Sequence, residues 1–331
     1  MSDINKYCRP FIKWVGGKTQ LLDNIIKRML KQLETKDDEG NKIIEMKNYH
    51  ELFIGGGSLL FAILYLKETN KIKINGSINA YDINPILISL YKNIQSNKDD
   101  LLKNIEKYQK TYESIKQLKV SQKSERKAST EEEAKKSREA YYYWMRKQYN
   151  SITDNTSIEK TALFLILNKT CFRGLYREGP HGFNVPFGNY KTETLNLLNR
   201  KSIDYLSQLF EDVNFQCSDF RTSFTNIEEN DFVYLDPPYA PENDKSFVNY
   251  VKDGFTLKDH KQLFALTKSL QDKKIKFVMS NSNVELVKNS FKNEDNDNDN
   301  HIIFKIDVIE AKRAINSKKP NSKTTEVLIY N

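Results

Sequence analysis

The chain has 331 residues, of which 38% are hydrophobic and 29% are charged. This length and composition allow one large domain or two modest ones with a sizeable core. The formal net charge of +8 is compatible with a polyanionic partner. A general bias towards Lys and Asn would give the same charge, so the charge alone does not decide between these interpretations.

Sparse cysteines and histidines argue against disulfide and metal frameworks. Cys8, Cys171 and Cys217 lie far apart, and no histidine has a partner at a metal-ligand spacing, so we expect no metal. No apolar run approaches the roughly 20 residues that a membrane span needs, and the first ten residues lack the apolar segment of a signal peptide. We therefore expect an intracellular protein, in a bacterial cytoplasm or, if a virus encodes it, in the host cell. The sequence leaves the oligomeric state open.

The first part of the chain alternates between helical and extended patterns. Apolar residues recur at helical spacing after the turn at Gly16 and Gly17, and Pro85 fits the first turn of a later helix. Residues 35–41 are polar and are expected to form a loop. The predicted order is helix (18–33), strand (ending near 53), helix (58–66), strand (77–81) and helix (86–94). This alternation predicts a parallel sheet with crossover helices.

The middle of the chain has a different character. Residues 99–149 are highly charged and mostly helical in pattern, with a stretch poor in apolar residues at 121–137. A second helix is expected at 160–168. Residues 169–191 are rich in Gly, Pro and aromatic side chains and have no clear period, which is typical of a loop-rich recognition segment.

The alternating pattern resumes near residue 213. Thr256 and Asp259 resemble a capping box, with Asp in place of Glu, at the start of a helix over 256–273. An acidic Asn/Asp loop is expected at 293–300. The predicted strands are 213–217, 232–235, 275–279, 301–309 and 326–330. The expected organisation is one α/β domain, formed by residues 1–95 and 196–331, with an insertion at 96–195.

A glycine turn and an acidic residue mark two strand ends. Gly55, Gly56 and Gly57 follow the first predicted strand, where glycine allows positive φ and close approach to a ligand. Asp82 ends the second strand, where an acidic residue can accept hydrogen bonds from ribose hydroxyls, including those of S-adenosylmethionine (SAM). An ordinary glycine turn and a surface Asp would give the same pattern. A P-loop is excluded because Gly17-Lys18-Thr19 lacks the required upstream glycine.

The tetrapeptide Asp236-Pro237-Pro238-Tyr239 follows the apolar run 232–235 and should lie at the carboxyl end of a core strand. The two prolines fix the backbone and remove two N–H donors. The Asp236 carboxylate and the Pro237 carbonyl remain as acceptors beside the aromatic ring of Tyr239. A proline-rich turn is the alternative explanation, but these four residues together favour a site for a planar amine.

Such a site suits the amino group of adenine, whose lone pair is delocalised into the ring. Two acceptors that bind its hydrogens expose the lone pair and stabilise the positive charge that develops during methyl transfer. Stacking on Tyr239 would hold the base for in-line attack. In a duplex the base must first be flipped out of the stack, at a cost of a few kcal/mol.

Six sequence blocks resemble, in the same order, the motifs of Dam-type DNA adenine N6-methyltransferases. The resemblance covers nearly the whole chain from about residue 9. It implies a Rossmann-like SAM-dependent methyltransferase sheet of the α/β class, with a helical, loop-rich DNA-recognition insertion. The blocks are residues 11–18, 53–58, 81–84, 172–177, 183–188 and 236–239.

The resemblance also implies residue roles. The catalytic residues would be Asp236, Pro237, Pro238 and Tyr239. The SAM-binding residues would be Trp14, Lys18, Phe53, Gly55, Gly57, Ser58, Asp82, Asp219, Phe220 and Asp236. The DNA-binding residues would be Lys13, Arg173, Leu175, Arg177, Asn184 and Pro186, although close relatives often carry Asn at the position of Arg173. Double-stranded DNA would be the partner, with GATC as the common target of the family.

The leading hypothesis is therefore SAM-dependent methylation of adenine N6 in duplex DNA by base flipping. A methyltransferase acting on RNA adenine, DNA cytosine or a protein amide is an alternative, as is a non-catalytic SAM- and DNA-binding regulator. The sequence leaves open whether the role lies in restriction-modification, repair marking or a viral genome.

Overall fold

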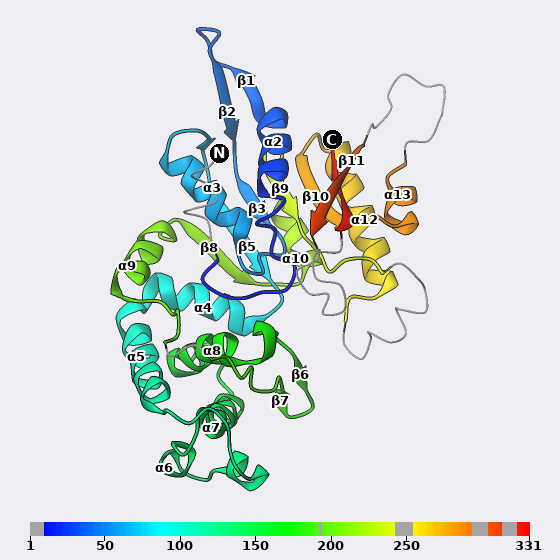
Figure 1. Cartoon of the computed structure of the whole chain (residues 1–331). Coiled ribbons are helices and arrows are strands. Elements are labelled where there is room, and N and C mark those ends of the chain that lie inside the picture. Colours follow the sequence, from blue (N-terminus) through cyan, green and yellow to red (C-terminus); the bar gives the residue numbers. More distant parts are fainter. Residues whose placement is uncertain (1–9, 192–193, 242–253, 293–303, 313–322) are drawn as a thin grey trace.

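A seven-stranded sheet forms the centre of the molecule (Figure 1). The computed structural model describes residues 10–191, 194–241, 254–292, 304–312 and 323–331. The strand order is β11-β12-β10-β9-β3-β5-β8. The strands are β3 (Tyr49–Glu51), β5 (Ile78–Asp82), β8 (Val213–Cys217), β9 (Phe232–Leu235), β10 (Lys276–Ser282), β11 (Lys305–Lys312) and β12 (Lys323–Tyr330). The five strands from β10 to β8 are parallel to one another, whereas β12 runs antiparallel to both β10 and β11.

The sheet is buried on both faces, as parallel strands require. Alternate residues of β9 show this: Phe232 and Tyr234 pack into one apolar core, and Val233 and Leu235 pack into the other. The first core includes α2 (Leu22–Leu33), α3 (Ser58–Glu68) and α4 (Pro85–Ser96), and the second includes α12 (Leu257–Asp272). The predicted α/β class with a mostly parallel sheet is confirmed.

A group of helices lies below the sheet (Figure 1). It contains α5 (Lys98–Ser114), η1 (Lys123–Lys127), α6 (Glu131–Ala134), α7 (Arg138–Ser151) and α8 (Ile158–Thr170). Helix α8 is buried along most of its length and contacts α4, α5 and α7. After α8 the chain forms a short turn, η2 (Phe172–Gly174), and a small hairpin of β6 (Glu178–Gly179) and β7 (Gly182–Phe183). This part agrees with the predicted helical, loop-rich character of the middle segment.

Several local predictions needed correction. Residues 35–41 were expected to be a loop, but β1 (Glu34–Lys36) and β2 (Lys42–Met46) form an antiparallel hairpin, to which β4 (Lys73–Ile74) adds. Strand β1 is fully exposed, so it has no hydrophobic alternation, and the Asp37 carboxylate holds the turn by accepting the Asn41 N–H at 2.7 Å. Four helices were not predicted from the sequence: α9 (Arg200–Leu209), α10 (Phe220–Ser223), η3 (Phe224–Asn226) and α13 (Glu285–Ser290).

Other predictions are confirmed or lie outside the described residues. Thr256 and Asp259 form the reciprocal capping box at the start of α12. The acidic loop at 293–300 and the first residues of the strand expected at 301–309 lie outside the described residues. None of the helices in the described part of the chain combines the length and apolar character that crossing a bilayer requires.

Asn168, on the buried helix α8, ties the N-terminal loop to the segment that follows α8. Its Oδ1 accepts the Lys13 N–H at 2.9 Å, and its Nδ2 donates to the Lys13 carbonyl at 2.7 Å and to the Gly174 carbonyl at 3.3 Å. The side chain is almost fully buried. It therefore satisfies the buried Gly174 carbonyl and two partly buried backbone groups of Lys13.

We expect Asn168→Ala to lower the free energy of unfolding by about 1–3 kcal/mol, because the substitution leaves buried backbone groups unpaired. Urea denaturation followed by circular dichroism measures the change. Asn104→Ala is the matched control, because Asn104 makes a solvent-exposed bond to the Asp100 carbonyl within α5. A loss for Asn168→Ala no larger than that of the control would contradict this role.

Candidate active site

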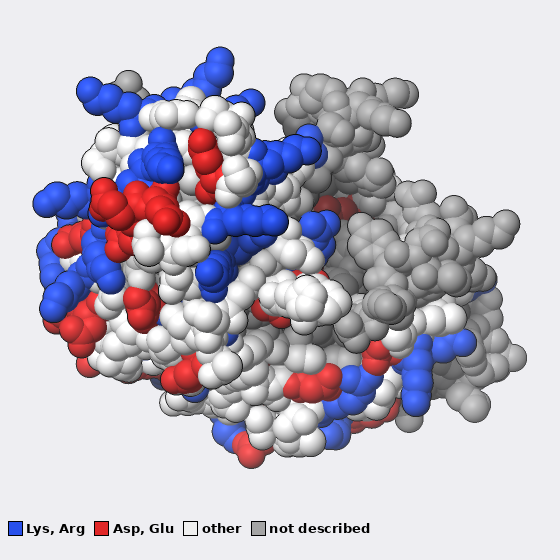
Figure 2. All heavy atoms as spheres, turned by 90° about the horizontal axis from the view of Figure 1, so that it is seen from below, with Lys and Arg blue, Asp and Glu red and all other residues white. Residues whose placement is uncertain are grey.

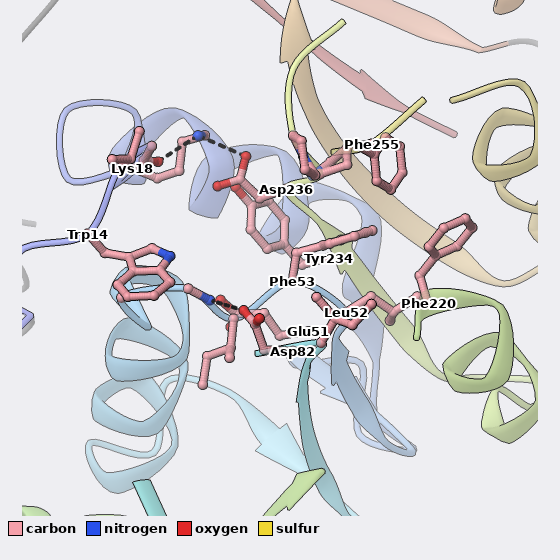
Figure 3. A pocket seen from close by; sticks show the side chains of 18 of the residues that line it. Trp14, Lys18, Glu51, Leu52, Phe53, Asp82, Phe220, Tyr234, Asp236 and Phe255 are labelled. Atoms are coloured by element: carbon pink, nitrogen blue, oxygen red, sulfur yellow. Dashed lines mark hydrogen bonds and ion pairs between the residues drawn. The ribbon is translucent and has the colours of Figure 1, made fainter. Parts of the chain in front are cut away.

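A cavity of about 710 Å³ opens at the carboxyl ends of β3, β5 and β9 (Figure 3). Its volume is in the range of pockets that hold cofactors and drug-sized ligands, and its place is where open α/β sheets bind ligands. It brings together all of the predicted SAM-binding and catalytic residues. These are Trp14, Lys18, Phe53, Gly55, Gly57, Ser58, Asp82, Asp219, Phe220, Asp236, Pro237, Pro238 and Tyr239.

The glycine turn between β3 and α3 forms one wall of the cavity. Gly55 and Gly57 have φ values of 49° and 73°, in the left-handed region that favours glycine. A Cβ atom on Gly57 would lie 2.9 Å from the Tyr91 hydroxyl oxygen, and that hydroxyl donates to the Gly55 carbonyl at 3.0 Å. The turn is therefore held from behind by α4, and its backbone faces the cavity.

Asp82 fixes the turn from the neighbouring strand. Its Oδ2 accepts the Gly55 N–H at 3.0 Å and its Oδ1 accepts the Asn84 N–H at 2.9 Å. Burial raises the pKa of this carboxyl, and the two backbone donors partly offset the rise. Asp82 thus holds the turn in place while it lines the cavity.

Aromatic side chains and an arginine form the far end of the cavity. Phe220 lies 5.9 Å from Phe53 and 5.5 Å from Phe255, measured between ring centroids. Asp219 caps α10 by accepting the Arg221 N–H, and the Arg221 guanidinium donates to Asp219 Oδ2 at 2.9 Å and pairs with Asp259 on α12. The guanidinium therefore links the loop that carries Phe220 to the start of α12.

Asp236 and Lys18 form an ion pair in the wall of the cavity. Lys18 Nζ lies 2.8 Å from Asp236 Oδ1 and also donates to the Gly16 carbonyl at 2.8 Å (Figure 3). Asp236 Oδ1 is buried, and its charged partner is this ammonium. Burial raises the pKa of Asp236 to about 6, and the ammonium of Lys18 limits the rise. An ionised carboxylate has about four lone-pair sites, so Asp236 can accept further hydrogen bonds besides the contact with Lys18.

Tyr239 packs against the same lysine. Its ring centroid is 4.7 Å from Lys18 Nζ, and its hydroxyl donates to Glu326 Oε2. The cation–π contact orients the ring beside Asp236.

Glu51 is a cavity residue to which the sequence analysis gave no role. It ends β3, is almost fully buried, and accepts the Tyr49 hydroxyl at 2.8 Å. Burial raises the pKa of Glu51 to about 8, and the nearby Asp236 carboxylate adds to the rise. In the sequence, the feature that could have identified Glu51 is an acidic residue at the end of a buried strand. Val15, Ile83, Arg221, Tyr234, Gly254, Phe255 and Asp259 also line the cavity and were missed.

The six predicted DNA-binding residues do not line the cavity. Lys13, Arg173, Arg177, Asn184 and Pro186 are exposed, and Leu175 is half-buried. Arg177 Nε donates to Asn184 Oδ1 at 2.6 Å, and the Pro186 carbonyl accepts the Phe172 N–H at 2.8 Å. These residues therefore share the surface around η2 and the β6–β7 hairpin.

Lys13 belongs to this surface although it lies far away in sequence. Its Nζ is 4.4 Å from the ring centroid of Tyr190, and a Cβ atom on Gly174 would collide with its side chain. Arg173 has a φ of 57°, which is unusual for a residue other than glycine. In the view from below, Lys and Arg side chains are numerous over the helical part of the chain and are mixed with Asp and Glu (Figure 2). Within the described ranges, no three His, Cys, Asp or Glu residues are grouped closely enough to hold a metal ion.

Comparison with known proteins identifies the family. The family model described as D12 class N6 adenine-specific DNA methyltransferase matches residues 14–315. The chain is 32% identical over 329 residues to the type II methyltransferase M.MjaIII of Methanocaldococcus jannaschii, covering 98% of this chain and 99% of that protein. It is 29% identical over 286 residues to a DNA adenine methylase of Haemophilus influenzae, covering 85% of this chain and 82% of that protein. It is 25% identical over 326 residues to a DNA adenine methylase of Escherichia coli K12, covering 97% of this chain and 94% of that protein.

The chain belongs to the D12 class of N6 adenine-specific DNA methyltransferases. Membership confirms the resemblance to adenine methyltransferases, the Rossmann-like methyltransferase fold and the expectation of an enzyme. The reaction therefore requires a methyl donor and DNA. The cavity described above is the candidate place for methyl transfer.

The pKa of Asp236 gives a pH prediction. A carboxyl whose pKa is about 6 is ionised above that pH, so we expect the methylation rate to fall as the pH drops through about 6. Lys18→Met removes the ammonium that lowers this pKa and should move the titration of Asp236 to higher pH. The carboxyl ¹³C shift of Asp236, followed by NMR across this range, measures the pKa independently of activity. Lys31→Met, at an exposed position of α2, should leave it unchanged, and an equal shift in both variants would refute the pairing.

Proposed function

We propose that this enzyme transfers a methyl group from SAM to N6 of an adenine that is flipped out of duplex DNA, within a GATC-like site. The observation that carries the proposal is the Asp236 carboxylate at the wall of the cavity. The same Lys18 ammonium pairs with this carboxylate and lies over the ring of Tyr239, so the two groups line the cavity together, and an ionised carboxylate can accept further hydrogen bonds. A carboxylate and an aromatic ring at the end of a core strand are the groups that a planar amine needs.

The cavity fits SAM by the chemistry of its wall. Asp82 can accept hydrogen bonds from the ribose hydroxyls, and Phe220 and the exposed Ile83 offer apolar surfaces for the adenine ring. Ser58 Oγ is buried and lacks a hydrogen-bond partner in the described part of the chain. Trp14, Lys18 and the backbone of Gly55 and Gly57 would enclose the methionine part. When bound, SAM supplies an electrophilic methyl group.

The chain's own residues would prepare the amine. Asp236 and the Pro237 carbonyl accept its two hydrogens, which exposes the nitrogen lone pair towards the methyl donor. Tyr239 stacks on the base and limits its rotation. The amine becomes acidic once it carries the methyl group, so a carboxylate with a pKa near 6 is basic enough to hold the departing proton.

The surface around the β6–β7 hairpin is the proposed DNA contact. The exposed guanidinium of Arg177 can bind a guanine bidentately in the major groove, and Lys13 and Arg173 can pair with phosphates. Leu175 and Pro186 would fill the space that the flipped adenine leaves. The GATC-like target follows from the resemblance of residues 172–188 to Dam-type enzymes.

We expect Asp236→Ala to abolish methyl transfer while the fold and SAM binding remain, because the amine loses its charged acceptor. Unmethylated DNA is incubated with enzyme and labelled SAM, and the modified adenines are mapped. Protection against a nuclease that adenine methylation blocks at GATC tests the target sequence. Near-normal turnover of Asp236→Ala would refute the mechanism, and methylation at other sequences only would refute the target.

Arg177→Ala should relax discrimination at one guanine of the target, at a cost of about 1–3 kcal/mol. The ratio of kcat/KM for the target and for duplexes with a single base replaced measures this change. Arg200→Ala is the control, because Arg200 is an exposed arginine on α9 that pairs with Asp99. A uniform loss of activity on all duplexes would instead indicate that Arg177 contacts a phosphate.

A further inference from the structure

The last strand of the sheet reaches the catalytic tetrapeptide from the side opposite to the glycine turn. Strand β12 pairs antiparallel with β10, and Glu326 is the register partner of Ser282 on β10. Glu326 on β12, and Asn281 and Ser282 on β10, contact Tyr239 and Ala240, which directly follow the two prolines. No motif in the sequence analysis assigned a role to β12 or to the end of β10.

Three side chains fasten the segment that follows the prolines. The Tyr239 hydroxyl donates to Glu326 Oε2. Asn281 Oδ1 accepts the Ala240 N–H at 3.1 Å, and Ser282 Oγ donates to the Ala240 carbonyl at 2.6 Å. Pro237 and Pro238 have no N–H to anchor this turn, so these contacts from β10 and β12 limit how Tyr239 can move.

Glu326 brings a second carboxylate towards the buried Asp236. Burial raises the pKa of the Tyr239 hydroxyl, and the Asp236 and Glu326 carboxylates add to this rise; burial also raises the pKa of Asp236, to which Glu326 makes a smaller contribution. Two like charges near one buried site repel each other. Only Lys18 supplies a compensating ion pair to Asp236 among the described residues. A neutral acceptor could bind the Tyr239 hydroxyl without this repulsion, so the hydrogen bond alone does not account for a carboxylate at this position.

We propose that Glu326 is a positioning residue for methyl transfer, which holds the Tyr239 ring in its stacking orientation and places a negative charge near the amine. The proposal rests on the proposed function of Asp236 and Tyr239. A hydrogen bond to a carboxylate is stronger than one to a neutral acceptor, so the ring is held more firmly than a buried tyrosine would be by packing alone. The negative charge favours the state in which the amine nitrogen becomes positive.

Three substitutions separate the charge of Glu326 from its hydrogen bond. Glu326→Gln keeps an acceptor and removes the charge. Tyr239→Phe keeps the ring and removes the hydroxyl, and Glu326→Ala removes both the acceptor and the charge. Glu285→Gln, at an exposed glutamate on α13, is the matched control. Single-turnover methylation is measured against pH for each variant, with urea unfolding to confirm the fold.

We expect Glu326→Gln to move the acid limb of the rate profile to lower pH, because the like charge that raises the pKa of Asp236 is gone. The other groups that face Asp236 are Lys18 from the N-terminal loop, Glu51 on β3, Tyr234 on β9 and Tyr239 after it. None of these residues is changed in this variant. Glu285→Gln should leave the limb where it is. A limb that does not move in Glu326→Gln would refute the electrostatic part.

The hydrogen bond is tested by a double-mutant cycle. Tyr239→Phe and Glu326→Ala should each slow single-turnover methylation by about tenfold, because each loses a hydrogen bond to a charged group. The double variant should be no slower than the slower single variant, because both substitutions remove the same bond. A duplex with 2-aminopurine in place of the target adenine should fluoresce more strongly in Glu326→Ala, since a loosely held ring stacks less on the flipped base.

Additive rate effects with unchanged 2-aminopurine fluorescence would overturn the positioning role, even if the wild-type enzyme methylates adenine normally. A wild-type enzyme that transfers no methyl group to adenine would overturn the proposed function, and this role with it. If Glu326→Ala does not fold, the pH profile of Glu326→Gln still decides the electrostatic part. The cycle is then completed with Glu326→Gln, whose rate effect should depend on the presence of the Tyr239 hydroxyl.

Discussion

The contact between Lys18 and Asp236 joins the two sequence regions on which the site depends. Lys18 comes from the loop before α2 and Asp236 follows β9, and their charged atoms lie 2.8 Å apart in a largely buried position. Burying a charge is costly unless it is paired, so the two segments stabilise each other. The lysine also orients Tyr239 through its ring. One ammonium group thereby sets the positions of both side chains that are proposed to bind the adenine.

Within the described residues, the acidic groups around the cavity outnumber its basic groups. Asp82, Asp236 and the buried Glu51 line it beside Lys18, the one lysine among the described lining residues, while Arg221 is already paired with Asp219 and Asp259. The raised pKa values of Glu51 and Asp236 show that burial disfavours their ionised forms. A ligand that brings positive charge would favour those ionised forms. SAM carries a sulfonium and an ammonium, so this imbalance agrees with the proposed donor.

Most of the cavity was predictable because each of its parts follows a strand that has a local signature. The glycine turn, Asp82 and the tetrapeptide at 236–239 all stand at the carboxyl ends of parallel strands, and parallel strands bring these ends together. Glu326 was not predictable in this way. It reaches the site through the antiparallel pairing of β12 with β10. The residues around Glu326 do not indicate in the sequence which strand β12 will pair with. The exposed strand β1 and the short helix α10 were missed because neither has enough apolar periodicity to be recognised.

The cavity and the proposed DNA surface share structural elements. Trp14 lines the cavity, and its ring lies 5.5 Å from the ring of Tyr176, which stands between Leu175 and Arg177. Next to Trp14, the backbone of Lys13 is bonded to Asn168, which also holds the Gly174 carbonyl. A displacement of the hairpin on binding DNA would therefore be transmitted to the wall of the cavity through packed and hydrogen-bonded groups. These shared contacts give a physical route by which binding of DNA to the hairpin surface could influence methyl transfer.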